Sequence, residues 1–532
     1  MQPFNYILHQ VVCEFCMANF LLAFTLLLLL QLQHSEPIVA YCSQTPYPDV
    51  CNSMVTRSDS VIEQSSLTWN EFRGLLHRAT LERTVFAHQR AVARNPSQFD
   101  EPGRRAWTDC VELLADTVRL VNQSLVRPGD DAQMWLSAAM TNQRTCRDGF
   151  LELGLTAPVM DDGGNLTESI RILLAVNNAM LIAAGGQHNR RRRLGLLFPE
   201  WMATADRKLL AESDVKSDFV VAQDGSGDYK SIAEAVAAVP KARGGSTARF
   251  VIHVKAGVYQ EYVEIPTTME NLMMTGDGMD ATVVTGSRSV KDGYTTPQSA
   301  TFGVSGNGFI ARDMTFQNTA GPEKEQAVAL LSKSDHSVFY NCSFKGYQDT
   351  LCVFSHTQFF RNCDVYGTID FIFGNAAVVF QNCNLCVRRP MKGQENVVTA
   401  HARSSSDEAT GISIHNSVVA AASDLAPVQG SFKTYLGRPW GEYSRTVVMK
   451  TELGDLIDPA GWLEWNGSFA LSTLYYGEFM NTGASADTSG RMHWDGYHVI
   501  DNSSEAEKFT VGSFLSGDSW IPATGIPFTS SL

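Results

Sequence analysis

The sequence predicts two domains of different fold class, an all-α four-helix bundle followed by an all-β parallel β-helix. Apolar residues recur with helical spacing through residues 41–187, whereas short strand-like runs separated by Gly, Asn and Asp follow after about residue 218. Within the second part, a short segment repeats every 20 to 23 residues. At 532 residues, the chain is also too long for one ordinary domain.

Residues 1–40 contain the apolar segment "MANFLLAFTLLLLLQLQ" at 17–33. Its apolar core of about a dozen residues is shorter than the roughly 20 residues of a membrane-spanning helix, and it suits the hydrophobic region of a signal peptide. No Lys or Arg precedes Arg57, so the usual positively charged start of a signal peptide is missing. We expect cleavage near Ala40 and secretion, with a retained signal anchor as the alternative.

Four of the eleven cysteines suggest two disulfides in the helical half. Cys42 and Cys51 flank the stretch "CSQTPYPDVC", and Cys110 and Cys146 lie on two predicted helices. In a secreted chain these pairs favour the disulfides Cys42–Cys51 and Cys110–Cys146. No CxxC pair stands beside a pair of histidines, so we expect no metal site. Glycosylation triplets that are compatible with secretion begin at Asn122, Asn165, Asn466 and Asn502.

The helical half, residues 41–187, contains four predicted helices. "TWNE" at 68–71 resembles a capping box that opens the first long helix. The third and fourth helices are "DDAQMWLSAAMTNQRTC" and "NLTESIRILLAVNNAML". In the second helix, the 3.6-residue period is followed by Cys110, Leu113, Leu114, Val118, Val121 and Leu125. No polar side chains converge in this four-helix bundle, so we expect a folding or regulatory role for it.

Residues 188–210 form a basic linker between the two halves. Its basic clusters are Arg190–Arg193 and Arg207-Lys208, in a segment without clear periodicity. Because exposed linkers are favoured sites of proteolysis, we interpret it as a processing site. An ordinary solvated linker is the alternative.

Three matching hexapeptides indicate a parallel β-helix in residues 211–532. "FYNCSF" (339–344), "FRNCDV" (360–365) and "FQNCNL" (380–385) recur with the same Asn and Cys. This period suits a fold in which one coil of strands and turns stacks on the next, so that equivalent side chains form ladders. The predicted asparagine ladder consists of Asn318, Asn341, Asn362, Asn382 and Asn416.

The ladder spacing brings two carboxylates together. Asp370 follows Asn362 by eight residues, and Asp349 follows Asn341 by eight. Gln326 has the same offset from Asn318, so all three side chains are expected in line on successive coils, about 4.8 Å apart. Strict alternation along a strand would turn Gln348 to the opposite face, and only a local twist or bulge would bring it in. Spacing leaves the orientation of Gln348 open.

Two carboxylates about 5 Å apart in an apolar setting cannot both ionise easily, so one pKa rises. Such a pair supplies one nucleophile or base and one acid at neutral pH, while glutamine amides donate to an oxyanion. A structural ladder of Asn, Gln and Asp without chemistry is the alternative.

The motif "LGRPW" (436–440) offers two further side chains: Arg438 can hold a carboxylate with two hydrogen bonds, and Trp440 can stack on a sugar ring.

These motifs resemble the plant pectin methylesterases that carry an N-terminal inhibitor-like domain. "GVYQE", "QAVAL", "GYQDTL", "YGTIDFIFGNA" and "LGRPW" occur in that family's order and approximate spacing, and "WLSAAMTNQRTCRDGF" resembles the inhibitor domain. The resemblance covers nearly the whole chain from Cys42 onward. It implies a right-handed parallel β-helix that hydrolyses methyl esters of homogalacturonan and releases methanol without a cofactor. The chain accordingly contains neither GxSxG nor HExxH.

The resemblance also implies residue roles. Asp370 corresponds to the nucleophile and Asp349 to the general acid that later acts as base. Gln326 and Gln348 match the oxyanion-hole glutamines, and Arg438 matches the residue that orients the nucleophile. The aromatic substrate positions fall on Trp440 and Phe373. The chain departs from the family directly after the acid, where Cys352, Phe354 and Thr357 replace the usual Tyr, His and Arg.

The expected partners follow from these roles. They are methyl-esterified homogalacturonan in the cell wall, a subtilisin-like protease at the linker and a separate proteinaceous inhibitor, and we expect a monomer. The net charge of −14 argues against nucleic acid as the main partner. Two rival functions remain: a retaining β-helix glycosidase, which also uses carboxylates about 5 Å apart, and a catalytically silent binding protein in which only the bundle functions.

Overall fold

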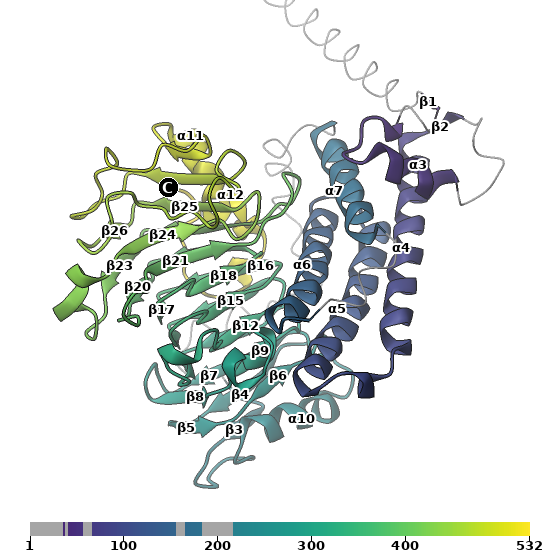
Figure 1. The fold of residues 1–532 in the computed structure, drawn as a ribbon. Helices are drawn as coiled ribbons and strands as arrows, with labels where there is room; N and C mark the ends of the chain where they lie inside the picture. The colour runs from purple at the N-terminus through teal and green to yellow at the C-terminus, as the bar shows by residue number, and fades with distance from the viewer. Residues whose placement is uncertain (1–35, 38–40, 57–65, 156–164, 184–215) are drawn as a thin grey trace, which may run out of the picture.

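The structure of the protein is a computed structural model that describes residues 36–37, 41–56, 66–155, 165–183 and 216–532. The predicted basic linker 188–210 and nearly all of the predicted signal segment 1–40 lie outside the described residues. A helical domain and a domain of stacked strands stand side by side (Figure 1).

The helical domain is the predicted four-helix bundle. A capping box starts the first long helix, with Thr68 N donating to the Glu71 carboxylate (2.8 Å) and Glu71 N donating to the Thr68 hydroxyl (3.3 Å). Both predicted disulfides, Cys42–Cys51 and Cys110–Cys146, are present. The four long helices are α4 (Trp69–Ala93), α5 (Glu101–Val126), α6 (Asp130–Glu152) and α7 (Leu166–Ala183), and the short helix α3 (Pro48–Thr56) precedes them. Strand β1 (Glu36–Pro37) pairs antiparallel with β2 (Ser66–Leu67).

Helix α7 is long and apolar enough to cross a membrane by composition alone. Its apolar residues, however, belong to the core of the bundle, where Ile170, Leu173 and Leu174 are fully buried. It is therefore a core helix of the helical domain.

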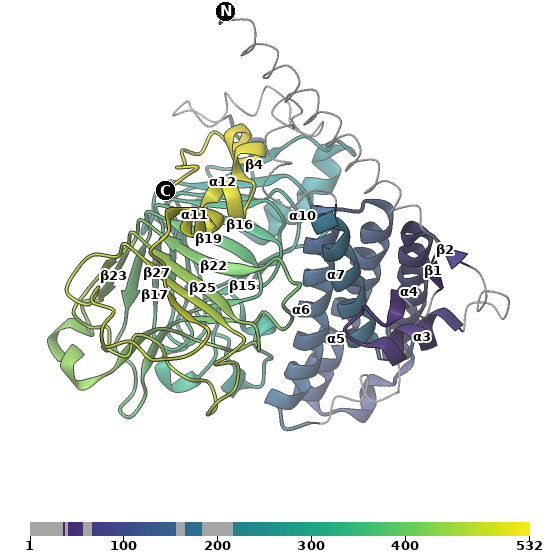
Figure 2. The same ribbon diagram turned by 90° about the horizontal axis from the view of Figure 1, so that it is seen from above.

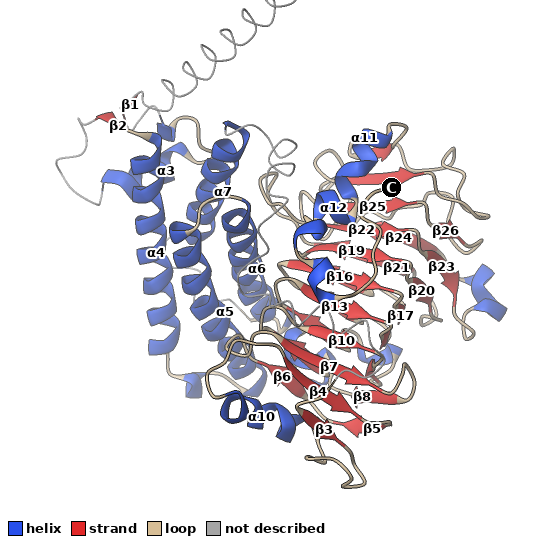
Figure 3. Cartoon of the chain, turned by 180° about the vertical axis from the view of Figure 1, so that it is seen from behind, coloured by secondary structure: helices blue, strands red, loops and turns tan. Residues whose placement is uncertain are grey.

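The second domain is a right-handed parallel β-helix, in which each complete coil contributes one strand to each of three parallel sheets and the coils at the ends contribute fewer. Figure 3 shows these strands stacked as successive rungs. The first sheet contains β3 (Phe219–Val221), β4 (Phe250–Val254), β7 (Leu272–Gly276), β10 (Ile310–Arg312), β13 (Ser337–Tyr340), β16 (Thr357–Arg361), β19 (Ala377–Gln381), β22 (Gly411–His415), β25 (Arg445–Met449), β27 (Tyr475–Phe479) and β28 (Tyr497–Val499).

The other two sheets complete each coil. The second contains β5 (Gly257–Gln260), β8 (Thr282–Gly286), β11 (Thr315–Asn318), β14 (Ser343–Lys345), β17 (Asp364–Gly367), β20 (Asn384–Val387), β23 (Val418–Ala421) and β26 (Glu452–Leu453). The third contains β6 (Val263–Ile265), β9 (Phe302–Val304), β12 (Leu330–Ser332), β15 (Leu351–Val353), β18 (Ile372–Gly374), β21 (Asn396–His401) and β24 (Thr434–Arg438).

The asparagine ladder lies at the turn between the first and second sheets. Its members have left-handed backbones, with φ of 51° at Asn341, 53° at Asn362, 56° at Asn382 and 52° at Asn416. Asn and Asp adopt this conformation more readily than other L-residues, which explains why the repeat requires them. The buried cysteines of the repeat lie beside them in the core.

The prediction that Asn318 belongs to this ladder is wrong. Strand β10 pairs with β13 so that Arg312 faces Tyr340, which places Asp313 (φ 58°) opposite Asn341. Asn341 donates to the Asp313 carboxylate at 3.1 Å. Asn318 instead ends β11 and donates to backbone carbonyls, including that of Val328 at 3.1 Å. The coil that contains Asn318 is longer than 23 residues, so counting back from Asn341 reached the wrong turn.

Helix α6 lies against the β-helix in two perpendicular views (Figures 1 and 2). Polar contacts join the domains, such as Asn375 to Thr141 on α6 (2.9 Å) and Asp407 to Asn178 on α7 (2.8 Å). At the N-terminal end of the stack, α10 (Ile232–Arg243) buries Ile232 and Val239 against the core, and α11 (Ser503–Ala506) and α12 (Val511–Phe514) lie near the C-terminal end.

Candidate active site

The two predicted acids occupy equivalent positions on neighbouring coils. Strand β15 pairs in parallel with β18 so that Leu351 faces Ile372, and each acid precedes its partner of this pair by two residues. Asp349 and Asp370 are 8% and 5% exposed, and both have left-handed backbones, with φ of 60° and 50°. The register therefore agrees with the alignment expected from spacing.

Arg438 holds the Asp370 carboxylate in a bidentate grip. Its Nε donates to Oδ1 at 2.8 Å and its Nη2 to Oδ2 at 2.6 Å. The arginine stands at the end of β24, two coils after the strand that follows Asp370. The Trp465 ring lies against the same guanidinium, with its centre 4.5 Å away. Charge-assisted, two-point contact of this kind fixes both the orientation and the ionised form of a carboxylate.

The environment separates the acid–base properties of the two carboxyl groups. Burial raises the pKa of Asp349 well above its usual range, and the charges of Asp370 and Glu152 raise it further. Burial also raises the pKa of Asp370, but Arg438 acts against that rise through its charge and hydrogen bonds. Arg438 favours the ionised form of Asp370, so Asp349 is the better proton carrier of the two.

Gln326 and Gln348 both line the cavity that contains the acids. The left-handed backbone of Asp349 interrupts strand alternation and explains how two successive residues, Gln348 and Asp349, face one cavity. The expectation that Gln326 lies in line with Asp349 is wrong, because the pairing of Leu330 with Leu351 places Gln326 two residues earlier on its coil. The cause is again the length of the coil that contains Asn318 and Gln326, which exceeds 23 residues.

The cavity has a volume of about 690 Å³ and is lined by both domains. Phe373 and Trp440, the predicted aromatic positions, lie on its wall with their ring centres 6.0 Å apart. The β-helix contributes Gln326, Gln348, Asp349, Cys352, Phe354, Asp370, Phe373, Arg438 and Trp440, and α6 contributes Thr141, Arg144, Thr145, Arg147, Asp148, Gly149, Leu151 and Glu152.

Helix α6 is fastened directly over this cleft. Arg144 donates to the backbone carbonyls of Trp440 (2.7 Å) and Ala402 (2.9 Å), and its guanidinium lies 4.4 Å from the centre of the Trp440 ring. The disulfide Cys110–Cys146 belongs to one apolar cluster with Cys352, Phe354 and Phe373. Two residues at which the chain departs from the family pattern thus pack against its own helical domain.

Several residues of the cleft were missed in the sequence. Trp465 and Phe469 line the cavity and are 37% and 40% exposed, and they come from an irregular segment that has no periodic pattern. The residues of α6 were missed because the bundle sequence shows no polar convergence; their place in the site depends on docking between domains.

Fold and site together define the class, a parallel β-helix enzyme with a buried carboxyl pair in a cleft that a helical domain covers. Within this class, the chain belongs to the pectinesterase family, because the pectinesterase family model matches residues 218–518 and the model for plant invertase/pectin methylesterase inhibitor matches residues 36–176. The chain is therefore a pectinesterase with an N-terminal inhibitor-like domain.

Its relatives include proteins of the same length and organisation. "Probable pectinesterase/pectinesterase inhibitor 17" of Arabidopsis thaliana is 50% identical over 94% of this chain and 95% of its own length. "Pectinesterase 2" of Citrus sinensis is 48% identical over 93% and 95%. Among solved structures, the pectin methylesterase from carrot is 56% identical, with a TM-score of 0.59, over 60% of this chain and 100% of its own.

Proposed function

We propose that the chain hydrolyses methyl esters of pectin with Asp370 as nucleophile and Asp349 as general acid and then base. The main support for this proposal is the pair of acids: Arg438 holds the Asp370 carboxylate with two hydrogen bonds, and burial raises the pKa of the neighbouring Asp349. Substrate class follows from the relatives, which include pectinesterases and a pectin methylesterase. Phe373 and Trp440 offer faces on which sugar rings can stack.

The proposed reaction has two steps. An Asp370 carboxylate oxygen attacks the carbonyl carbon of the galacturonate methyl ester, and Gln326 and Gln348 donate to the resulting oxyanion. The C–OCH₃ bond breaks, and Asp349 gives its proton to the departing methoxide, which leaves as methanol. Asp349 then takes a proton from water, whose oxygen attacks the acyl-enzyme and frees Asp370. No cofactor takes part.

Replacing the nucleophile tests this assignment. Asp370→Asn should abolish methanol release from methylated pectin while circular dichroism remains that of the folded chain. Asp364→Asn is the matched control, because Asp364 lies on the same coil in β17 and its carboxylate accepts a hydrogen bond from Asn384 (2.7 Å) outside the cleft, so its turnover should match the wild type. Substantial turnover by Asp370→Asn would overturn the nucleophile assignment.

The same assay decides between the proposed function and its rivals. Methanol without new reducing ends is the signature of the esterase, whereas new reducing ends without methanol would indicate a retaining glycosidase. A wild-type chain that yields neither product, with the linker intact or cut, would indicate the silent binding protein.

We further propose that the helical domain restrains the enzyme in cis. This proposal is supported by the position of α6, which lines the same cleft as Asp370 and is fastened by Arg144 to the backbone carbonyl of Trp440. Processing at the basic linker 188–210 by a subtilisin-like protease, secretion to the cell wall and a monomeric state complete this proposal. Nucleic acid is not among the proposed partners, given the net charge of −14.

Two arginines one turn apart on α6 allow a matched test of this restraint. Arg144→Ala removes the contacts with Trp440 and Ala402, and should raise the methanol release of the uncut chain several-fold. Arg147 also lines the cleft, but it is 52% exposed and pairs with Asp148 on its own helix, so Arg147→Ala leaves the Arg144 contacts in place and should change the rate much less than Arg144→Ala. Equal activity before and after linker cleavage, together with no effect of Arg144→Ala, would rule out restraint in cis.

A further inference from the structure

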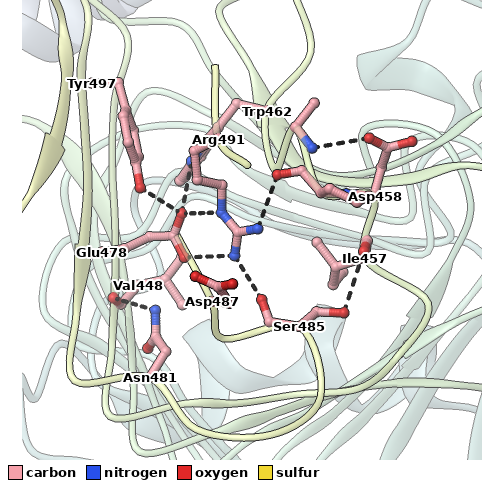
Figure 4. Close-up of polar contacts among 12 residues, drawn as sticks. Val448, Ile457, Asp458, Trp462, Glu478, Asn481, Ser485, Asp487, Arg491 and Tyr497 are labelled. Carbon is pink, nitrogen blue, oxygen red and sulfur yellow. Dashed lines mark hydrogen bonds and ion pairs between the residues drawn. The ribbon is translucent and has the colours of Figure 1, made fainter. Parts of the chain in front are cut away.

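A buried ion pair lies outside the cleft, beyond β24. Glu478 on β27 and Arg491 in the following loop have side chains that are 2% and 1% exposed. Arg491 Nε donates to Glu478 Oε1 at 2.7 Å and its Nη2 to Oε2 at 3.1 Å. Figure 4 shows two ring donors on the same carboxylate, namely Trp462 Nε1 at 3.2 Å and the Tyr497 hydroxyl at 3.1 Å.

Arg491 also holds the backbone of the segment that precedes Trp462. It donates to the carbonyls of Pro459 (3.2 Å) and Ser485 (2.7 Å), as Figure 4 shows for Ser485. Gly461, with φ of 71°, allows the close approach, because a Cβ there would lie 2.3 Å from Arg491 Cδ. A buried ion pair seldom stabilises a fold more than apolar residues of similar volume would, so such a fully bonded pair needs another explanation.

The segment held by this pair is bonded to the strand that carries Arg438. Leu436 N donates to Gly461 O (2.8 Å), and Leu463 N donates to Gly437 O (3.0 Å). The Trp462 ring packs closely against Gly437, because a Cβ atom on this glycine would lie only 3.1 Å from the ring. The two residues that precede Arg438 on β24 are thus supported from the Glu478 side.

Two further contacts continue the support. Trp462 stacks on Tyr476 with ring centres 4.2 Å apart, and Tyr476 is on the same strand as Glu478, two residues before it. Three residues after Trp462, the Trp465 ring lies against the Arg438 guanidinium, 4.5 Å from its centre. The segment 461–465 therefore contacts Arg438 or its neighbours through both backbone and side chains.

We propose that Glu478 and Arg491 are positioning residues for catalysis, which hold Arg438 in its two-point grip on Asp370 by way of Trp462. This inference rests on the proposed function, in which Asp370 must be ionised to attack the ester. It assigns a catalytic consequence to a pair that touches neither substrate nor the reacting atoms.

The pH dependence of turnover distinguishes positioning from mere stability. A displaced Arg438 no longer offsets the effect of burial on Asp370, so the pKa of Asp370 rises and activity is lost at a higher pH on the acidic side. In the full-length chain, Arg491→Lys and Glu478→Gln should move the acidic limb of kcat up by about half a pH unit or more. Trp462→Phe, which removes only the ring N–H donor and part of the stacking surface, should move it in the same direction by less.

Met449→Ala is the matched control, because Met449 is fully buried on neighbouring β25 in a separate apolar cluster. It should lower the Tm without moving the acidic limb. An unmoved limb in Trp462→Phe and in those ion-pair variants that fold would overturn the inference. Asp370→Asn in the same assay separates the two levels: if it retains turnover, the proposed function fails, and if it is inactive while the limb stays fixed, only the positioning role fails.

Discussion

At the scale of single residues, the left-handed backbones of Asp349 and Asp370 shape the site. Each acid stands at the turn before a strand of the third sheet, where Asp tolerates a positive φ better than most residues. The sequence spacing predicted that these acids align. It left the orientation of the Gln348 side chain open, because the alternation of side chains between two faces holds only for a regular strand. The turn conformation that brings Gln348 into the cavity has no signature in the spacing.

Arg438→Lys is our prediction at this scale. Lysine keeps the charge but cannot make the two parallel hydrogen bonds, so kcat should fall by about 100-fold. The weaker grip also raises the pKa of Asp370, and since the ionised form is the nucleophile, the acidic limb of kcat should move to higher pH. Arg388→Lys is the control, because Arg388 contacts Asp424 and Tyr347 outside the cleft. An unchanged pH profile for Arg438→Lys would contradict the proposed grip.

At the scale of elements, the repeat predicted the coils well, and its errors have one cause. Matching hexapeptides correctly indicated parallel stacking and an asparagine ladder through Asn341, Asn362 and Asn382, and the structure adds that these residues have left-handed backbones. The count failed at Asn318 and Gln326, because the coil from Asp313 to Asn341 is longer than the two coils between Asn341 and Asn382. Repeat spacing carries information only where successive coils have nearly the same length.

The ladder predicts a measurable difference between two asparagines. Asn382 has φ of 56° and accepts a hydrogen bond from Asn416 (2.7 Å), whereas Asn384 is an exposed residue at the start of strand β20. Asn382→Ala should lower the free energy of unfolding by about 1–2 kcal/mol, since alanine pays the cost of the left-handed backbone. Asn384→Ala should stay within about 0.5 kcal/mol. Urea unfolding followed by circular dichroism would show whether the two differ in this way.

At the scale of the whole molecule, the chain is an enzyme with its own helical domain across the cleft. The sequence predicted both folds from their separate periodicities, but not the docking of α6, because contacts between domains follow no local pattern. The apolar cluster that joins Phe354 to the Cys110–Cys146 disulfide shows what the departures from the family pattern contact.

Docking of the two domains should depend on pH. Asp109 on α5 accepts hydrogen bonds from Gln298 (2.6 Å) and Thr295 of the β-helix, and burial raises its pKa to about 6 despite these bonds and the charge of Lys333. A carboxyl group whose pKa is raised on docking binds its proton more tightly in the docked state, so acid favours docking. This contribution is complete below the ordinary pKa of 3.8 and is lost as pH rises through about 6.

The prediction is that the two halves, cut at the linker, associate about tenfold more weakly at pH 7 than at pH 5 through Asp109 alone. Asp109→Asn should flatten this part of the dependence, as measured by sedimentation of the cut protein across that range. Asp130→Asn is a control, because Asp130 is the first residue of α6 and, within the part of the chain that the structure describes, Thr295 and Gln298 bond to Asp109 and not to Asp130. Identical profiles for wild type and Asp109→Asn would contradict the assignment.

The coil-by-coil arrangement of the site limits how this chain can change in length. Asp349 precedes β15, Asp370 precedes β18, and Arg438 ends β24. In the third sheet, only β21 lies between β18 and β24. Gaining or losing one whole repeat is an easy route by which stacked proteins grow or shrink. Between residues 349 and 370 such an event would preserve a sound fold yet separate the two acids, and between residues 370 and 438 it would separate the arginine from its carboxylate. Added rungs near either terminus would leave the chemistry intact.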